Sequence, residues 1–301
     1  MRFVGLGGVA PIISLILLAM RLSGKLPLPL LQSAGRQMGR LIFRLDRRHR
    51  EIALNNLRFA FGGQRSSAEL IRMAIGVFEG IGQIPLEVCW SLQVDRRNWK
   101  KFFKISGLDH YRKAAAGGNG VLFLTAHVGN WELFPVVGAM AGIPLHVVYR
   151  PLDSPVFDEV VGRIRRRFGA RLIPKKKSVF KINQALRNGQ CIAILLDQNV
   201  DWYEGVFVDF MGHRACTSKG LATLSILSRA PVVPVFLVRE GAGFHAHFEP
   251  PIYPRVSGDR IRDLEENTQR YNQAIESVVR RYPDQWFWVH QRWKTPPYHP
   301  I

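Results

Sequence analysis

Short, mainly apolar runs mark the chain from residue 121 onward and predict buried strands. They cover residues 121–126, 145–149, 191–196 and 232–238. Runs of this length, bounded by glycine, proline or polar residues, are typical of strands rather than of helices. Residues 244–248 follow the turn-forming segment 239–243 and predict a hairpin with the last of these runs.

Segments with helical spacing separate the runs, at residues 155–167, 179–188 and 219–228. This alternation predicts an α/β fold with a mostly parallel or mixed central sheet flanked by helices. The expected hairpin favours a mixed sheet, because tight turns join antiparallel strands. Residues 205–212 alternate like a further hairpin strand, and Thr217 and Ser218 are then candidates to cap the next helix, whose start would also suit a phosphate.

The first ninety residues predict helices. Ser66 and Glu69 form a capping box that begins a helix running toward Leu92. Residues 30–61 are basic and amphipathic, so they either lie on a bilayer or pack on the domain with their arginines in solvent. Residues 3–20 carry no charge, which predicts an N-terminal membrane-anchor helix. The alternative, a cleaved signal peptide, has little support, because the positive start is Arg2 alone.

The formal net charge of +19 and the pI near 10.5 predict attraction to polyanions. Nucleic acid, anionic lipid headgroups, a phosphorylated glycolipid and an acidic carrier protein all fit this charge. Basic residues after position 20 would hold the remainder of the chain in the cytoplasm by the positive-inside rule. The densest basic cluster, either a docking face or a solvated surface, consists of Arg163, Arg165, Arg166, Arg167, Arg171, Lys175, Lys176 and Lys177.

The three cysteines bear on the redox compartment and on a redox function. Cys89, Cys191 and Cys216 form no CxxC pair and no dense framework. This pattern is compatible with a reducing compartment and equally with three ordinary buried thiols. A redox function is therefore not expected.

Candidate chemistry follows the run 121–126 directly, in His127 and Glu132. A histidine accepts a proton from a hydroxyl near neutral pH, and a carboxylate can fix its tautomer and stabilise the imidazolium. Five residues of regular helix turn by about 500°, which leaves the two side chains roughly 140° apart. A strand-to-helix turn would instead let them converge. The alternative is a core histidine bound to a nearby carboxylate, a common structural pair.

The turn between these two residues contains Gly129 and Asn130. Both residue types tolerate unusual backbone angles, so we expect them to shape the turn. Backbone amides exposed there would stabilise an oxyanion.

Two other strand ends carry candidate binding residues. Arg150 follows the run 145–149, so its guanidinium would bind developing negative charge or else pair with Asp153. Asp197 and Gln198 follow the run 191–196. The carboxylate would orient a basic residue or serve the fold, the second being favoured, and the amide would hold a sugar hydroxyl or backbone. Near the C-terminus, three tryptophans mark either a lipid boundary or a completed core: Trp286, Trp288 and Trp293.

The stretch from His127 to Glu132 resembles the His-x4-Asp/Glu signature of membrane-associated glycerolipid and glycolipid acyltransferases. Its Asn-Trp-Glu ending resembles the bacterial lipid A late acyltransferase branch. Similar segments follow in the family's order over roughly residues 40–295, at residues 50–61, 149–152, 197–199, 205–212 and 283–294. Two segments depart from the pattern: residues 290–294 read His-Gln-Arg-Trp-Lys where the lipid A enzymes commonly show a His-Arg-Arg-Phe-Lys-like series, and residues 197–199 differ from some branches.

The resemblance implies a membrane-associated O-acyltransferase. It would move a fatty acyl group from an acyl thioester, acyl-ACP or acyl-CoA, to a hydroxyl of a glycolipid such as a lipid A precursor. A lysophospholipid or another glycolipid is the alternative acceptor. His127 would deprotonate the hydroxyl and Glu132 would orient the histidine, while Arg150 would act at the thioester oxyanion or an acceptor phosphate. The resemblance also implies no metal, no cofactor and no covalent enzyme intermediate.

The resemblance and the charge pattern together predict a place in the cell. Residues 1–25 would form the membrane anchor, and residues 26–301 the acyltransferase domain with its N-terminal helical region. The domain would face the cytoplasm at the bacterial inner membrane, against anionic lipid.

Two other classes fit the sequence less well. A membrane-tethered nucleic-acid-binding protein would match the charge, but no zinc-finger, RRM or KH signature is present, and no specific nucleic-acid partner is expected. A metal hydrolase would need ligands such as His127, Glu132 and His146. The sequence contains neither HExxH nor a convincing ligand cluster.

Overall fold

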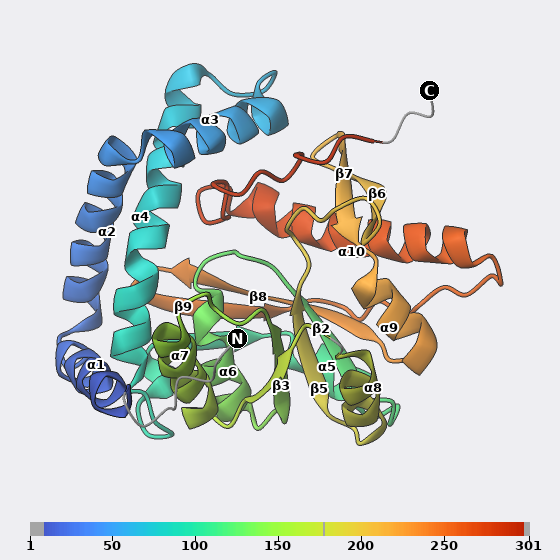
Figure 1. The fold of residues 1–301 in the computed structure, drawn as a ribbon, viewed down its shortest axis with the longest axis horizontal. Coiled ribbons are helices and arrows are strands. Elements are labelled where there is room, and N and C mark those ends of the chain that lie inside the picture. Colours follow the sequence, from blue (N-terminus) through green and yellow to red (C-terminus); the bar gives the residue numbers. More distant parts are fainter. Residues whose placement is uncertain (1–8, 177, 298–301) are drawn as a thin grey trace.

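The computed structural model describes residues 9–176 and 178–297, so residues 3–8 of the predicted anchor and Lys177 of the basic cluster lie outside it. A seven-stranded sheet forms the centre, in the order β1-β9-β8-β2-β5-β3-β4 (Figure 1). Its strands are β1 (Phe103–Ser106), β2 (Val121–Thr125), β3 (Leu145–Tyr149), β4 (Arg171–Pro174), β5 (Cys191–Leu195), β8 (Val232–Glu240) and β9 (Gly243–Phe248).

The sheet is mixed, as the sequence predicts. Strands β8, β2, β5, β3 and β4 are parallel, whereas β9 pairs antiparallel with β8 and carries β1 in its own direction. The predicted strands all form within two residues of the expected bounds. Strands β1 and β4, which lie at the two edges, were not predicted from the sequence. Each has four residues with only one fully buried side chain, so neither shows a continuous apolar run.

Helices cover both faces of the sheet (Figure 1). The described helices beyond residue 100 are α5 (Leu108–Ala115), α6 (Phe134–Ala141), α7 (Pro155–Arg167), α8 (Val179–Arg187), α9 (Gly220–Ser228) and α10 (Arg260–Arg281). Alternate residues of β2 point to opposite sides: Leu122 and Leu124 join the core with α8, α9 and α10, and Val121 and Phe123 join the core with α5, α6 and α7. The sheet is therefore buried on both faces, as a parallel sheet requires.

A separate hairpin, β6 (Gly205–Phe210) and β7 (His213–Ser218), packs on α10 and confirms the predicted strand at residues 205–212. The predicted cap of the following helix is wrong for Thr217. Its hydroxyl donates to the Ala215 carbonyl and accepts from Arg292, because Thr217 is still part of the buried strand β7. Helix α9 begins at Gly220, whose amide donates to the Ser218 hydroxyl at 3.3 Å.

Four helices make up the N-terminal region: α1 (Ala10–Ser23), α2 (Leu28–Leu45), α3 (Arg47–Phe61) and α4 (Ser67–Ser91). The predicted capping box of Ser66 and Glu69 forms at the start of α4. The single predicted segment 30–61 is two helices, because Asp46 accepts from the His49 amide and caps a new helix. Helices α2 and α4 pack so closely that a Cβ on Gly39 would lie 2.1 Å from the Phe78 carbonyl oxygen.

The N-terminal anchor is not established by these helices. Within the described ranges, no single helix is both long and apolar enough to cross a bilayer. Helices α1 and α2 reach that length and hydropathy only as a pair, which is bent by 113° at its break. Their outer surface carries exposed apolar side chains: Ile12, Leu15, Leu18, Leu22, Leu26, Leu30, Met38, Leu41 and Leu45.

Candidate active site

The candidate site lies where two neighbouring parallel strands end. Strands β2 and β5 pair in register from Val121 opposite Cys191 to Thr125 opposite Leu195. His127 and Asp197 each follow two residues after these last pairs, so both emerge at the same edge of the sheet. The His127 ring meets Asp197 there, with 2.8 Å between Nδ1 and Oδ1.

Asp197 is buried and fully engaged. Its Oδ2 accepts from the His127 amide at 2.9 Å and from the Trp286 indole at 2.8 Å, in addition to the ring contact through Oδ1. Burial by itself would raise the pKa of Asp197, but the charge of His127 and the hydrogen bonds from His127 and Trp286 lower the pKa to about 2. The ionised carboxylate favours a proton on His127 Nδ1 and leaves Nε2 free to accept another.

Glu132 has a different partner from the one predicted. Arg165 of α7 donates through Nε and Nη2 to both carboxylate oxygens, at 2.8 to 3.0 Å. The predicted contact of Glu132 with the His127 ring is therefore wrong, and Asp197 contacts the ring instead. The physical reason is the 3-10 turn η2 (Trp131–Leu133), which directs Glu132 toward α7, where the forked guanidinium matches both oxygens of the carboxylate.

Gly129 and Asn130 both have unusual backbone angles, as predicted. Gly129 has φ of +62°, and a Cβ there would lie 2.1 Å from the Leu237 carbonyl oxygen, so only glycine fits. Asn130 combines a φ of −123° with a ψ of 83°, which lies outside the helical and extended regions. Its buried side chain caps η2 by accepting from the Glu132 amide at 3.2 Å.

The predicted oxyanion role of this turn is not supported. The amide of Gly129 donates to the Gln285 carbonyl at 2.9 Å, and the amide of Asn130 donates to the Leu237 carbonyl at 3.3 Å. Both donors are therefore occupied by the fold. Such pairing is what a buried backbone N–H needs, and it leaves neither amide for a reacting oxygen.

Arg150 and Gln198 lie on the surface beyond the strand ends. The side chain of Arg150 is 81% exposed and pairs with Asp153 at 3.2 Å, which is the alternative that the sequence left open. Gln198 is exposed next to the buried Asp197. The structure thus brings His127 and Asp197 together and leaves these two residues at the periphery.

The C-terminal tail completes the site, a contribution that the sequence analysis did not foresee. The Phe287 amide donates to the His127 carbonyl at 3.0 Å, and the His290 ring accepts at Nε2 from the Asn199 amide at 2.9 Å. Trp286 and Trp288 are almost fully buried, which confirms that they complete a core. The regular recurrence of aromatic residues in this tail was the available signal.

An aromatic wall stands beside the histidine. The rings of Trp131 and Phe287 lie with their centroids 4.7 and 5.9 Å from that of His127. A small hollow next to them is lined by Ile81 and Ile84 of α4. The surroundings of the ring are therefore apolar on this side.

One group among the described residues has the donors of a metal site. Glu240, His245 and His247 bring ligand atoms within 4.8 Å of one another, on the β8–β9 hairpin and not at the strand end of His127. Burial and then the charge of His245 lower the pKa of His247 to about 4, and the positive charges of Arg281 and Lys104 also act on this group. These cations oppose a bound dication, so we assign the group no metal.

His127, Glu132 and His146, the metal ligands considered from the sequence, do not come together as a ligand group in the described part of the chain. His146 is buried within β3, where desolvation and then the charge of Arg171 lower its pKa. It forms no ligand group with His127 and Glu132 among the residues that the structure describes.

A histidine oriented by a buried carboxylate, at the edge of a parallel sheet and beside an apolar wall, is an arrangement typical of enzymes that use a general base on a hydroxyl. The comparison of the chain with known proteins agrees with this class. The chain belongs to the bacterial lipid A biosynthesis acyltransferase family, which it matches over residues 9–295. The resemblance identified from its motifs is therefore confirmed, and the chain is an acyltransferase.

Several characterised relatives have similar length. The chain is 27% identical over 280 residues to the lipid A biosynthesis palmitoleoyltransferase of Escherichia coli K12, covering 91% of this chain and 88% of the relative. It is 27% identical over 278 residues to the lauroyltransferase of the same strain, with the same coverage. It is 28% identical over 264 residues to the myristoyltransferase, covering 86% of this chain and 79% of the relative.

Proposed function

We propose that this protein transfers a fatty acyl group from an acyl thioester to a hydroxyl of a lipid A precursor. The observation that carries the proposal is the contact of His127 with the buried, ionised Asp197. The family assignment and the lipid A acyltransferase relatives support the acceptor class. Both acyl-ACP and acyl-CoA present the same thioester and a negative charge, which suits the basic α7.

The proposed reaction follows from which atoms of the site donate and accept protons. Asp197 accepts a hydrogen bond from the Nδ1–H group of neutral His127 and stays ionised, so Nε2 takes the proton of the acceptor hydroxyl as its oxygen attacks the thioester carbonyl. The tetrahedral intermediate then expels the thiolate, and the proton on Nε2 passes to the sulfur. The products are the ester and the free thiol, and no acyl-enzyme forms.

Glu132 keeps a catalytic part in this proposal, through Arg165. The bidentate ion pair fixes the Arg165 guanidinium, which also lies over the Tyr149 ring at 5.8 Å. A fixed guanidinium near the strand ends stabilises the negative oxygen of the intermediate or a phosphate of the acceptor. Arg150 and Gln198 are proposed to contact the acceptor's phosphate and sugar at the rim.

Membrane association is proposed from the N-terminal helices. Basic residues accompany the exposed apolar residues of α1 and α2: Arg21 on α1, Lys25 in the connection between the helices and Arg44 on α2. Apolar side chains that enter the acyl region beside cations that meet anionic headgroups are typical of a helix lying in the bilayer interface. We propose that the protein sits on the cytoplasmic face of the inner membrane in this way, with its donor arriving from the cytoplasm.

Lipid mass spectrometry tests the function. The protein would be expressed in cells that make a lipid A precursor but lack their own late acyltransferases, and one acyl increment on that precursor is expected. His127→Ala should reduce the rate about 10³-fold, because the base is lost. His49→Ala is the matched control, since His49 also contacts an aspartate but lies exposed on α3.

Two results would contradict the proposal in different ways. An unchanged lipid profile with the unaltered chain would exclude the lipid A precursor as acceptor. Full activity in a folded His127→Ala protein would exclude the general-base mechanism.

A further inference from the structure

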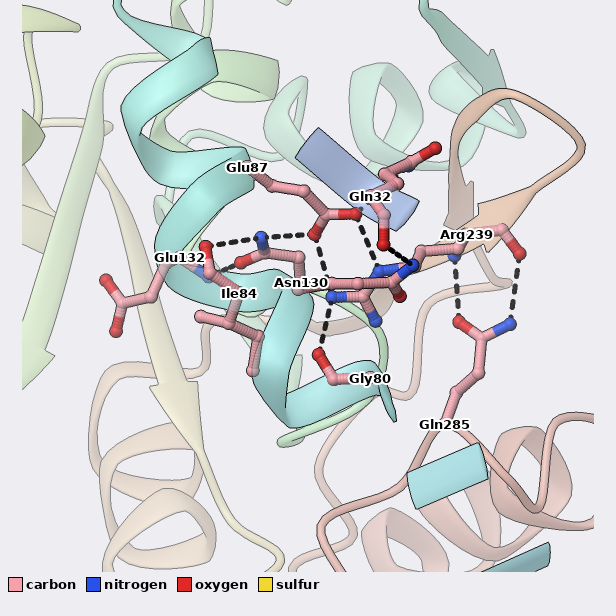
Figure 2. Close-up of polar contacts among 9 residues, drawn as sticks. Gln32, Gly80, Ile84, Glu87, Asn130, Glu132, Arg239 and Gln285 are labelled. Carbon is pink, nitrogen blue, oxygen red and sulfur yellow. Dashed lines mark hydrogen bonds and ion pairs between the residues drawn. The ribbon is translucent and has the colours of Figure 1, made fainter. Parts of the chain in front are cut away.

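Glu87 is a fully buried carboxylate near the C-terminal end of α4, and it is held by an arginine from the sheet. Arg239 of β8 donates through Nε to Oε1 at 2.8 Å and through Nη2 to Oε2 at 2.7 Å (Figure 2). Arg239 also donates to the Gly80 carbonyl at 3.0 Å. Taking such a pair out of water is costly, and apolar residues of the same volume would often be at least as stable. The pair therefore calls for an explanation other than stability.

Two further donors show what the carboxylate connects. Gln32 of α2 donates to Oε1 of Glu87 at 3.1 Å, and Asn130 of the catalytic turn donates to Oε2 at 2.7 Å (Figure 2). Both are buried. Glu87 thus joins an N-terminal helix, the central sheet and the turn that follows His127.

Asn130 carries this connection to Glu132. Its amide nitrogen is bound to Glu87, while its amide oxygen accepts from the Glu132 backbone N–H at 3.2 Å. Two acceptors face the Asn130 NH₂ group, Glu87 Oε2 at 2.7 Å and the Ile84 carbonyl at 3.4 Å. The shorter, charged contact with Glu87 contributes most to fixing the orientation of the amide. In Figure 2 the Glu132 carboxylate points away from this network. It is bound instead by Arg165.

Arg239 attaches the other part of the same turn. Its backbone amide and carbonyl pair with the side-chain amide of Gln285, at 2.8 and 3.0 Å. The Gln285 carbonyl in turn accepts from the Gly129 amide at 2.9 Å. The turn is consequently held at Asn130 by the Glu87 side chain and at Gly129 by the Arg239 backbone, through Gln285.

We propose that Glu87 is a positioning residue for acyl transfer, which with Arg239 holds the turn between His127 and Glu132 and through Gln32 ties it to α2. This inference rests on the proposed function. Glu87 touches neither His127 nor the carboxylate of Glu132, and it acts through the Asn130 amide. Because α2 belongs to the surface proposed to meet the membrane, the pair also connects that surface to the catalytic turn.

The test compares the kinetics of the Glu87→Gln variant with those of Glu79→Gln, which is the matched control. Both residues lie on α4 and contact a residue of α2, but Glu79 pairs with Arg40 and has no link to the turn. In Glu87→Gln the new NH₂ group replaces either the oxygen that accepts from Gln32 and Arg239 Nε or the oxygen that accepts from Asn130 and Arg239 Nη2. Either way the two-pronged contact with Arg239 is broken, and the turn is held less firmly. We expect kcat to fall about 10- to 100-fold with KM within about threefold, since small misplacements of reacting groups cost rates of this order. Glu79→Gln should stay within about twofold of the parent in both constants.

Hydrogen exchange of the peptide covering residues 126–134 gives a second measurement that needs no substrate. Exchange at the Glu132 amide should be faster in Glu87→Gln and unchanged in Glu79→Gln. If the single variant does not fold, Glu87→Gln combined with Arg239→Gln removes both buried charges and lets two amides pair. That protein should melt near the parent and still show fast exchange and low kcat.

The outcomes separate this inference from the function. Wild-type exchange of the turn in the folded variant overturns the positioning role, and so does fast exchange with an unchanged kcat. If the unaltered chain fails to acylate a lipid A precursor, the proposed acceptor is wrong, and the exchange result still decides whether Glu87 holds the turn.

Discussion

Two histidine–aspartate pairs in this molecule have nearly the same contact and very different surroundings. At the strand ends, His127 and Asp197 lie 2.8 Å apart with side chains that are 18% and 2% exposed. On the N-terminal helices, His49 and Asp46 lie 2.7 Å apart with side chains that are 47% and 37% exposed. Water solvates the second pair and screens it, whereas the first is enclosed by protein donors. The comparison teaches that burial of the carboxylate, and not the contact alone, gives the first pair its chemistry.

Neutralising each carboxylate in turn should give the largest difference between the two pairs. Asp197→Asn must present an NH₂ group to one of its three donors, and if that is His127 Nδ1, the ring proton moves to Nε2 and the base is lost. We expect kcat to fall about 10³- to 10⁴-fold, as a wrong histidine tautomer does in other enzymes. Asp46→Asn keeps a residue that caps helices well and should change kcat less than twofold. Rates measured on the purified proteins with an acyl thioester and a lipid A precursor decide the matter, and equal losses would erase the distinction.

The free energy of unfolding in acid should also distinguish the two pairs, by a smaller amount. The pKa of Asp197 is about 2 when folded, against an ordinary value of 3.8, so the unfolded chain takes up this proton first as pH falls. The stabilisation is complete above about pH 4 and is lost as pH falls through about 2, an effect on the order of 2 kcal/mol. Urea unfolding between pH 5 and pH 2 should show this loss in the parent and in Asp46→Asn. Asp197→Asn should lack it, and a parallel decline in all three would refute the linkage.

The smallest expected effect concerns the helices that carry the exposed pair. Leu15→Ser, Leu18→Ser and Leu22→Ser together remove apolar surface from α1, so binding to anionic vesicles should weaken about tenfold or more. Leu227→Ser on α9 is the control, because Leu227 is equally exposed on a helix outside the proposed membrane surface. Vesicle sedimentation measures the difference. Turnover of detergent-dispersed substrate should remain near the parent value, and unchanged vesicle binding would exclude α1 as the contact.

Much of the sheet could be predicted from the sequence, since its central strands are buried on both faces and show as apolar runs. The edge strands β1 and β4 could not, because residues such as Lys104 and Arg171 interrupt them. Helix α10 was not predicted from the sequence for a similar reason. It buries Tyr271 and Ile275 along one stripe but carries charges around the remainder of its surface.

The site shows the same division between local and distant signals. His127 was found because it directly follows an apolar run, and Gly129 because its turn requires a left-handed backbone. Its true partner Asp197 lies seventy residues away and becomes a neighbour only once β2 and β5 are known to pair. Glu132 was the closer carboxylate in sequence, and the turn directs it to Arg165 instead. Sequence spacing alone cannot rank two carboxylates whose positions depend on strand order.

The tail contacts have a consequence for the synthesis of the protein. The ribosome makes His127 and Asp197 long before it makes Trp286 and Phe287, which hold the aspartate and the histidine backbone. A nascent chain therefore carries the base and its carboxylate without the groups that lock them together. The pair is enclosed as in the folded protein only after residues 286 and 287 have been made and have packed against it.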